Sequence, residues 1–511
     1  MKLSLAASLL AVCAGCGSGG GSPDAGTGLP DAFAPTPRGE FPDDFLWGSS
    51  MSAYQVEGGL HDTDWYQWES LCDGCSGDSA DDGPDFWTHF NADFANAVQI
   101  SNNAIRIGID WSRVFPTEAQ FTAGEPDASA VAHYHEIITA ARSRGLDVML
   151  TLIHFVLPLW LHDLENPEEA PGWADPSIVD RVGDYAGWAA AEFGADVDYW
   201  ITLNEPFVNA VSGWISGDMP PGKSFEVDKA LEVGERMIWA HARAYDAIHE
   251  ADVVDANGDG IATAVSVAKH QRVFLPMDPQ DPADVRAAEM LRYLFNEVFL
   301  RAAAFGCLDR NYDFDCDDPD DLTNEAALLG RLDYIGLNYY GVSLVVGTND
   351  NQFPMIGIPF FNDLDRYEVD GPISDFGWTI YPHGLRSVID ELLPYDLPII
   401  ITENGVADAT DALRPRFLLE HLYVVNQAID DGIDIDGYYY WSLFDNFEWG
   451  AGFCPRFGLY HVDFESPSRS RTPGEGADVY RQIIEDNTVA PELFDLYPEY
   501  GAASSCPRTG L

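Results

Sequence analysis

Short apolar runs alternate with longer amphipathic stretches from about Phe41 to within some twenty residues of the end of the chain. Eight of the runs have the length and the β-branched or aromatic content of buried strands. They cover residues 44–50, 103–114, 147–155, 198–206, 261–270, 333–341, 397–405 and 436–446. Segments with helical spacing of apolar residues lie between them, at 128–144, 178–193, 228–250, 283–305, 385–393 and 416–430. No linker rich in Gly, Pro and Ser interrupts the series, so we expect one folded domain.

Eight strands that alternate with helices predict a parallel sheet, and eight strands close a (β/α)8 TIM barrel around one packed interior. A doubly wound sheet would alternate in the same way, but it needs a Gly-rich phosphate loop after its first strand. The segment WGSSMSAYQVEGG at that point lacks the GxGxxG spacing. The sequence therefore favours a single α/β barrel domain over residues 41–490.

Polar side chains stand at or just beyond the carboxyl ends of these strands. In a barrel such ends open into one shared pocket. The residues are Arg106, His154, Asn204, Glu205, Asn338, Tyr340, Glu403, Trp441 and Asp445, with Gln55 shortly after the first strand. We therefore expect a single functional site at this end of the barrel.

Two of the strands end on a glutamate beside an asparagine, in YWITLNEPF around Glu205 and in PIIITENGV around Glu403. Cleavage of a glycosidic bond needs one carboxylic acid that protonates the leaving oxygen and one carboxylate that attacks the anomeric carbon or activates water. A single glutamate at a strand end could equally pair with an arginine at the barrel rim. The repeated arrangement favours catalysis over that structural role.

Arg106 strengthens the catalytic interpretation. It alternates with Ile105 and Ile107 in a predicted core strand, and an unpaired buried charge costs several kcal/mol. Arg106 must therefore find a carboxylate. A guanidinium beside one glutamate would hold that glutamate ionised at neutral pH, as a nucleophile requires.

The N-terminal segment has the features of an export signal. Lys2 precedes the apolar run LSLAASLLAVCAG, and a stretch rich in Gly, Ser and Pro follows Cys16. The CAGC ending resembles a bacterial lipoprotein signal, which predicts a lipid on Cys16, removal of residues 1–15 and a flexible tether over residues 16–40. Cys13 is unusual for that motif, so ordinary secretory cleavage remains an alternative. The expected location is the cell envelope, with secretion as the second possibility.

Charge narrows the choice of partners. The chain has 84 acidic and 27 basic residues, a net charge of −57, which disfavours nucleic acids and anionic membrane surfaces. Any contact with a membrane would be made through the lipid, and the sequence does not indicate the oligomeric state.

Six cysteines follow Cys16, and disulfides are the default state of cysteines in an exported chain. The sequence alone does not fix the pairing. The separations suggest Cys72 with Cys75 and Cys307 with Cys316, which leaves Cys454 to tie down the tail of residues 491–511 through Cys506. A metal site at CDGC is disfavoured because no second CxxC or His pair accompanies it.

The chain as a whole resembles glycoside hydrolase family 1, the β-glucosidase and β-galactosidase group, from residue 41 to about 487. The motifs that carry the resemblance include FPDDFLWGSSMSAYQVEGG, NAIRIGIDWSRVFP, TLIHFVLPLWL, WITLNEP, DYIGLNYY, GWTIYPHGL, IITENG and GYYYWSLFDNFEWGAGFCPRFGLYHVDF. It implies a retaining mechanism in a (β/α)8 barrel, without metal or cofactor, on β-glucosides or related oligosaccharides.

The resemblance also implies roles for single residues. Glu205 would be the acid/base and Glu403 the nucleophile. Asn204 would hold the sugar 2-hydroxyl, and Arg106 and Tyr340 would position and charge-balance Glu403. The remaining candidates would bind the sugar in the glycone subsite, and they are Gln55, His154, Asn338, Trp441, Glu448 and Trp449.

The chain departs from the family pattern after the third strand. The family has His-Trp-Asp there, and this chain has His154-Phe155-Val156, so one aromatic wall of the glycone subsite should be smaller.

An acidic loop offers a calcium hypothesis. Asp255, Asn257, Asp259 and Gly260 match the first half of a calcium loop, but Ser266 stands where the last ligand would be. A solvated acidic turn is the favoured interpretation.

Three functional classes remain in view. A retaining β-glycosidase is favoured. A hydrolase of 6-phosphorylated β-glucosides is disfavoured by Glu448, whose carboxylate would repel a phosphate dianion. A non-catalytic carbohydrate-binding relative is disfavoured because both glutamates are present.

Overall fold

A computed structural model describes residues 35–72, 75–347, 355–357, 372–504 and 506. The predicted signal, Cys16 and most of the tether lie outside the described residues.

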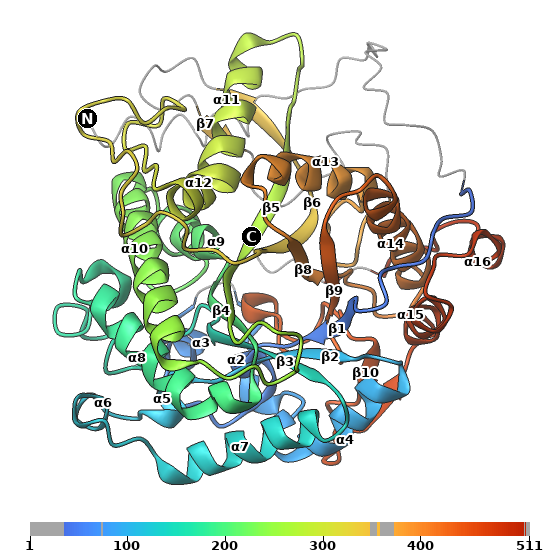
Figure 1. The fold of residues 1–511 in the computed structure, drawn as a ribbon, viewed down its shortest axis with the longest axis horizontal. Helices are drawn as coiled ribbons and strands as arrows, with labels where there is room; N and C mark the ends of the chain where they lie inside the picture. The colour runs from blue at the N-terminus through green and yellow to red at the C-terminus, as the bar shows by residue number, and fades with distance from the viewer. Residues whose placement is uncertain (1–34, 73–74, 348–354, 358–371, 505, 507–511) are drawn as a thin grey trace. The chain divides into compact units, whose positions relative to one another are not determined.

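Eight parallel strands form a closed barrel (Figure 1). Each strand pairs with its neighbours in parallel, and the pairing of β5 with β6 completes the ring. The strands are β1 (Leu46–Ser50), β2 (Ala104–Gly108), β3 (Asp147–Ile153), β4 (Tyr199–Asn204), β5 (Ala264–Pro276), β6 (Ile335–Gly347), β8 (Ile399–Asn404) and β9 (Ile435–Trp441). A short strand, β7 (Met355–Gly357), pairs antiparallel with the far end of β6. The predicted TIM barrel is confirmed.

The longer helices follow the strands in sequence, as the pattern predicts. They are α4 (Phe86–Gln99), α7 (Ala128–Arg142), α8 (Ile178–Phe193), α10 (Val227–Ala251), α11 (Pro282–Arg292), α12 (Val298–Phe305), α13 (Pro382–Leu392), α14 (Arg414–Asp430) and α15 (Glu475–Asp486). Several begin at sequence signals for a helix start. Asp127 accepts hydrogen bonds from the first amides of α7, and Asp281 does so for α11, where Pro282 takes the first helical position.

Shorter elements complete the fold. They are α2 (Ala53–Val56), α3 (Asp64–Leu71), α5 (Trp111–Val114), α6 (Glu118–Ala123), α9 (Pro206–Val211), α16 (Pro491–Leu496), β10 (Tyr460–Val462) and β11 (Arg471–Pro473). The helix expected over 283–305 differs from the prediction, because a π-helical turn, Tyr293–Glu297, separates α11 from α12. The side chain of Asn296 in this turn bonds to both the amide and the carbonyl of Arg272 in β5, which holds the irregular turn against the barrel.

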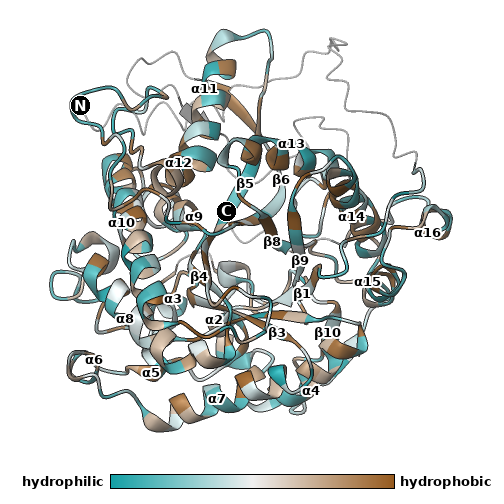
Figure 2. Ribbon diagram, viewed as in Figure 1, coloured by the Kyte–Doolittle hydropathy of each residue, from teal (hydrophilic) through white to brown (hydrophobic). Residues whose placement is uncertain are grey.

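The barrel interior is filled by side chains from successive strands. The cluster comprises Leu46, Ala104, Met149, Ile201, Ala264, Ala268, Tyr334, Ile400 and Tyr439. Gly48 of β1 makes room for the largest of them, since a Cβ at this position would lie 2.3 Å from the ring of Tyr439. Figure 2 shows strong apolar colour on central strands such as β8, and apolar and polar colours alternating along the surrounding helices. The filled interior leaves the carboxyl ends of the strands as the place for a site.

Three disulfides confirm the predicted pairing, Cys72–Cys75, Cys307–Cys316 and Cys454–Cys506. The last of them links the loop after β9 to the C-terminal segment. That segment also contacts the fold through the amide of Cys506, which donates to the carbonyl of Asp375.

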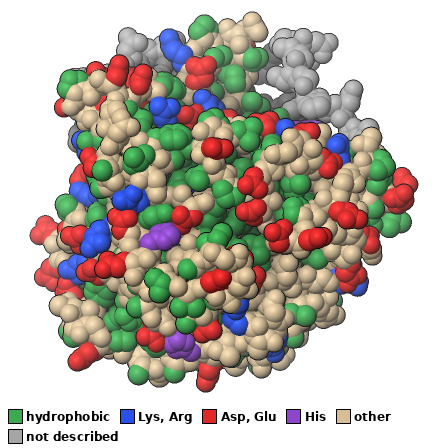
Figure 3. Space-filling model, in the orientation of Figure 1, with side chains coloured by type: hydrophobic (Ala, Val, Ile, Leu, Met, Phe, Trp, Pro, Cys, Tyr) green, Lys and Arg blue, Asp and Glu red, His purple; other side chains and the backbone are tan. Residues whose placement is uncertain are grey.

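Acidic side chains are spread over the face of the molecule seen in Figure 3. In the loop that raised the calcium hypothesis, the Asp255 carboxylate accepts the amides of Gly258 and Gly260, and the Asp259 carboxylate accepts that of Ile261. Across the described ranges, no three His, Cys, Asp or Glu side chains are grouped so that they could hold a metal ion. None of the helices in the described part of the chain has the length and apolar character needed to cross a bilayer.

Candidate active site

The two predicted glutamates occupy different backbone settings at the same end of the barrel. Glu403 lies within β8, one residue before its end, in a fully buried strand. Glu205 follows the last residue of β4 and precedes Pro206, the first residue of α9. Its backbone is left-handed, with φ 45° and ψ 57°, a conformation that is uncommon for residues other than glycine. The strand therefore turns sharply into the helix at Glu205.

Arg106 joins four strands beneath the site. Its Nη1 donates to Oε1 of Glu403 at 2.6 Å and to the carbonyl of Thr402 at 3.2 Å. Its Nη2 donates to Oδ1 of Asn204 at 2.7 Å, and its Nε to the hydroxyl of Thr151 at 2.9 Å. The guanidinium is completely buried, and the expected carboxylate partner is Glu403.

Side chains from β6 bind the two glutamates. The hydroxyl of Tyr340 donates to Oε2 of Glu403 at 2.8 Å. Asn338 donates through Nδ2 to Oε1 of Glu205 at 2.8 Å and to Oδ1 of Asn204 at 3.2 Å, while its own oxygen accepts from Thr402. The amide of Asn338 is fully occupied by these partners and Asn338 is not among the residues that line the cavity, so in this structure it positions Glu205, and its contact with sugar stays a prediction.

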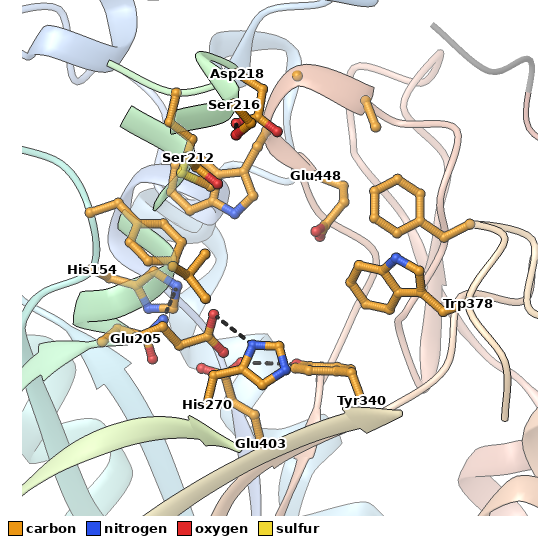
Figure 4. A pocket seen from close by; sticks show the side chains of 18 of the residues that line it. His154, Glu205, Ser212, Ser216, Asp218, His270, Tyr340, Trp378, Glu403 and Glu448 are labelled. Carbon is orange, nitrogen blue, oxygen red and sulfur yellow. Dashed lines mark hydrogen bonds and ion pairs between the residues drawn. The ribbon is translucent and has the colours of Figure 1, made fainter. Parts of the chain in front are cut away.

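A cavity of about 470 Å³ opens above these residues. In Figure 4, Glu205 and His154 lie on one side, Glu448 on the opposite side, and Tyr340, His270 and Glu403 at the base. The structure brings eight of the predicted site residues to its wall. They are His154, Asn204, Glu205, Tyr340, Glu403, Trp441, Glu448 and Trp449.

His154 stands between aromatic rings and an amide. Its ring stacks with those of Trp441 and Trp449, with centroids 5.7 and 5.9 Å away, and its Nε2 accepts from Nδ2 of Asn204 at 3.0 Å. Burial lowers the pKa of His154 well below its ordinary value, and the Arg106 charge adds to this effect. His154 is therefore neutral at physiological pH. Its ring nitrogens are polar atoms in a wall formed by the rings of Trp441 and Trp449.

Gln55 lies behind Glu448 instead of lining the cavity. Its amide nitrogen donates to the carbonyl of Phe447 at 2.8 Å and to Oε2 of Glu448 at 3.5 Å, and its oxygen accepts from Ser52. Burial, together with the charges of Glu403 and Glu205, raises the pKa of Glu448 to about 8. A protonated Glu448 can both donate to and accept from sugar hydroxyls.

Phe155, which stands where the family has Trp, lines the cavity. Its ring packs 5.2 Å from that of Trp449, and its backbone has a positive φ of 69°. Val156 lies in the same aromatic cluster.

The electrostatics of the two glutamates differ from the sequence expectation. Burial raises the pKa of Glu403 to about 7, and the negative charge of Glu205 also raises it, while Arg106 and the Tyr340 hydroxyl oppose this shift. Burial also raises the pKa of Glu205, but the His270 imidazole and the Asn338 amide outweigh it, so the pKa of Glu205 is lowered. The carboxyls titrate as a pair, because ionisation of one disfavours ionisation of the other.

The setting of Glu205 also contains basic side chains. Three basic residues of β5, Lys269, His270 and Arg272, act on its carboxylate. The nearest atom is Nδ1 of His270, 3.5 Å from Oε2. The sequence carried a signal for them, since KHQR places three basic side chains within four residues at the end of an apolar strand.

Further residues that the sequence analysis missed line the outer part of the cavity. Trp378 packs against Tyr340, with ring centroids 5.4 Å apart, and presents an aromatic surface opposite Glu205 (Figure 4). Trp68, Met219, Phe376 and both cysteines of the Cys72–Cys75 disulfide also contribute to the wall. The outer part therefore combines these apolar side chains with the polar Ser212, Ser216 and Asp218 (Figure 4), whereas the base carries Glu205 and Glu403.

A barrel whose base holds two buried carboxyls, one paired to a guanidinium, has the site of a glycoside hydrolase. The family model for glycosyl hydrolase family 1 matches residues 37–489. A β-galactosidase of Pyrococcus woesei is 34% identical over 89% of this chain and 98% of its own length. A 6-phospho-β-galactosidase of Staphylococcus epidermidis is 29% identical over 88% of this chain and 99% of its own length. The structure of a β-glycosidase of Thermosphaera aggregans superposes with a TM-score of 0.77, at 30% identity, over 89% of this chain and 99% of that one.

The chain belongs to glycosyl hydrolase family 1, and it is a retaining β-glycosidase.

The buried ion pair yields a stability prediction. Arg106→Met should destabilise the protein by about 3–5 kcal/mol, because it leaves the Glu403 carboxylate buried without its cation. For a chain of this length that is a fall of roughly 3–5 °C in Tm. The double variant Arg106→Met/Glu403→Gln should recover part of this loss, because it removes the orphaned charge. Calorimetry of both variants measures the difference, and equal Tm values for the two would contradict the role given to the ion pair.

Proposed function

We propose that the protein is an exported β-glycosidase that hydrolyses terminal β-linked glucosyl or related residues through a covalent glycosyl-enzyme intermediate. Glu403 is the nucleophile and Glu205 the acid/base. The observation that carries this assignment is the asymmetry of hydrogen bonding at the cavity base. Glu403 accepts from a guanidinium and from a tyrosine hydroxyl, whereas Glu205 accepts from an amide and has an imidazole nitrogen 3.5 Å away.

These partners suit the two roles. A nucleophile must be ionised in the free enzyme, and the Arg106 ion pair favours the ionised form of Glu403 against burial. An acid/base must hold a proton in the first step and lose it in the second. The direct neighbours of Glu205 are the Asn338 amide and the His270 imidazole, neither of which carries the fixed charge of a guanidinium, although the basic residues of β5 lower its pKa in the unliganded site.

The first step begins with the sugar ring between the two carboxyls. Glu403 attacks the anomeric carbon while Glu205 gives its proton to the leaving oxygen. This ester consumes the negative charge of Glu403, so the pKa of Glu205 falls, and the ionised Glu205 then takes a proton from water that attacks the anomeric carbon. Two displacements at one carbon retain the β-configuration.

The roles of the glutamates are separable by chemical rescue. Glu403→Gly should lose hydrolysis by several orders of magnitude, and azide or formate should restore turnover with an α-configured product. Glu205→Ala should lose most activity on poor leaving groups and much less in the first step on 2,4-dinitrophenyl glycosides, which need no proton. Azide should rescue Glu205→Ala with a β-configured product, as read by NMR. A common response of the two variants would refute the assignment.

The sugar preference follows from the inner wall. Glu448 stands there with Gln55 behind it, and among the described residues that line the cavity the one Lys or Arg side chain is Arg272 of β5. Arg272 acts on Glu205, whereas the charges that act on Glu448 are those of Glu403 and Glu205.

We therefore expect p-nitrophenyl β-glucoside, β-galactoside and β-fucoside to be cleaved. The 6-phosphorylated glycosides should be at least about tenfold poorer in kcat/KM, a difference of about 1.4 kcal/mol in transition-state binding. Equal or better turnover of the phosphorylated substrates would favour a 6-phospho-β-glycosidase.

Export is proposed from the apolar run that ends at Cys16, from the polar segment behind it, and from the three disulfides of the folded domain. Disulfides persist in oxidising compartments. A lipid on Cys16 would place the enzyme at the membrane surface.

Cys16→Ser should release the protein from the membrane fraction, because the lipid attachment point is lost. Fractionation of cells that express the wild type and the variant measures this, with Cys13→Ser as the matched control that should stay membrane-bound. A wild type that is already fully in the soluble fraction would overturn the anchor.

A further inference from the structure

His270 is a buried polar group to which the two-carboxylate mechanism gives no role. It stands in β5 opposite Asn338 of β6 and is 5% exposed. In Figure 4 its ring lies at the cavity base between Glu205 and Tyr340. Neither ring nitrogen completes a hydrogen bond with a described residue. Burying two unsatisfied nitrogen atoms is unfavourable, which indicates that the ring serves the site.

Nδ1 of His270 faces a carboxylate oxygen (Figure 4). Nδ1 lies 3.5 Å from Oε2 of Glu205, slightly beyond a full hydrogen bond. Hydrogen bonds of this kind are often long in an unliganded active site and shorten when substrate is bound. Once Glu205 is ionised, its Oε2 can only accept, so the ring should carry its proton on Nδ1.

The groups that face His270 keep its ring uncharged. Burial lowers its pKa, and Arg272 and Lys269 of the same strand lower it further, while Glu205 alone opposes them. Tyr340 of β6 faces the ring, and its pKa is far above physiological pH, so it stays neutral. Phe295 of the π turn is apolar. A neutral imidazole can donate from Nδ1 without adding a positive charge.

We propose that His270 is a positioning residue that stabilises the ionised form of Glu205 as it gives up its proton. In the first step the Oε2–H bond of Glu205 breaks, its proton goes to the glycosidic oxygen, and the bond between that oxygen and the anomeric carbon breaks. His270 keeps its own proton throughout. Its Nδ1–H donates to the carboxylate that forms, and the same bond holds this carboxylate as the base of the second step. The inference rests on the proposed role of Glu205.

The contribution is therefore larger in the transition state than in the ground state. A hydrogen bond to a charged acceptor is stronger than one to a neutral acceptor, and in the proposed first step Glu205 becomes charged as the leaving group departs. Such a bond accelerates the chemical step and does not merely improve substrate binding.

The test compares His270→Phe with His270→Asn, whose side-chain N–H lies near the position of Nδ1. His270→Phe should lower kcat/KM on phenyl β-glucoside by about tenfold or more and leave 2,4-dinitrophenyl β-glucoside nearly unchanged. The basic limb of the kcat/KM profile should move to higher pH by about 0.5–1 unit, because a lost hydrogen bond to the carboxylate raises the pKa of Glu205. His270→Asn should recover at least half of both effects.

The control is His421→Phe, which removes a buried histidine of α14 that bonds to the Phe417 carbonyl and does not line the cavity. The pH profile of kcat/KM for His421→Phe should match that of the wild type, and so should its ratio of kcat/KM values on phenyl and 2,4-dinitrophenyl β-glucoside. The inference is overturned if His270→Phe keeps the wild-type basic limb, or if it slows both substrates equally. A wild type without β-glycosidase activity would instead refute the proposed function.

Discussion

The buried guanidinium of Arg106 is the constraint on which the rest of the structure depends. Removing such a charge from water costs several kcal/mol unless its donors are satisfied. The partners come from three other strands, with Thr151 in β3, Asn204 in β4, and Glu403 beside the Thr402 carbonyl in β8. These strands meet around one cation only in a closed barrel, so the interaction that organises the active site also ties the barrel together.

The site is built from two electrostatic halves that meet at the carboxyls. One half is the ion pair between Arg106 and Glu403. The other half consists of the β5 residues Lys269, His270 and Arg272, which lie near Glu205. Burial lowers the pKa of Lys269 to about 7 and also lowers that of His270. The charge of Lys269 beside Glu205 can therefore change near neutral pH, whereas the guanidinium beside Glu403 stays charged. The position of the proton that Glu205 and Glu403 share therefore depends mainly on the protonation of the basic residues of β5.

Much of this arrangement could be predicted from the sequence. The strand ends at Glu205 and Glu403 and the isolated Arg106 in an apolar strand follow from local patterns, which is why the barrel and the ion pair were predictable. The positions of Gln55 and Asn338 were not, because a strand-end amide can face the cavity or support a neighbour, and only three-dimensional packing decides. The π turn at Asn296 depends on a contact with a distant strand. The position of His270 beside Glu205 depends on the packing of β5 in the barrel, which the local sequence does not show.

The backbone at the two glutamates has a consequence for which substitutions each position tolerates. Glu403 lies within strand β8 and does not have a positive φ, so no left-handed conformation restricts the choice of side chain there. Glu205 adopts a left-handed conformation, which Gly, Asn and Asp accept readily and β-branched residues resist. The backbone conformation therefore limits which residues can replace Glu205, whatever their chemistry. A related protein that has lost the acid would most readily have Gly, Asn or another small residue at this position.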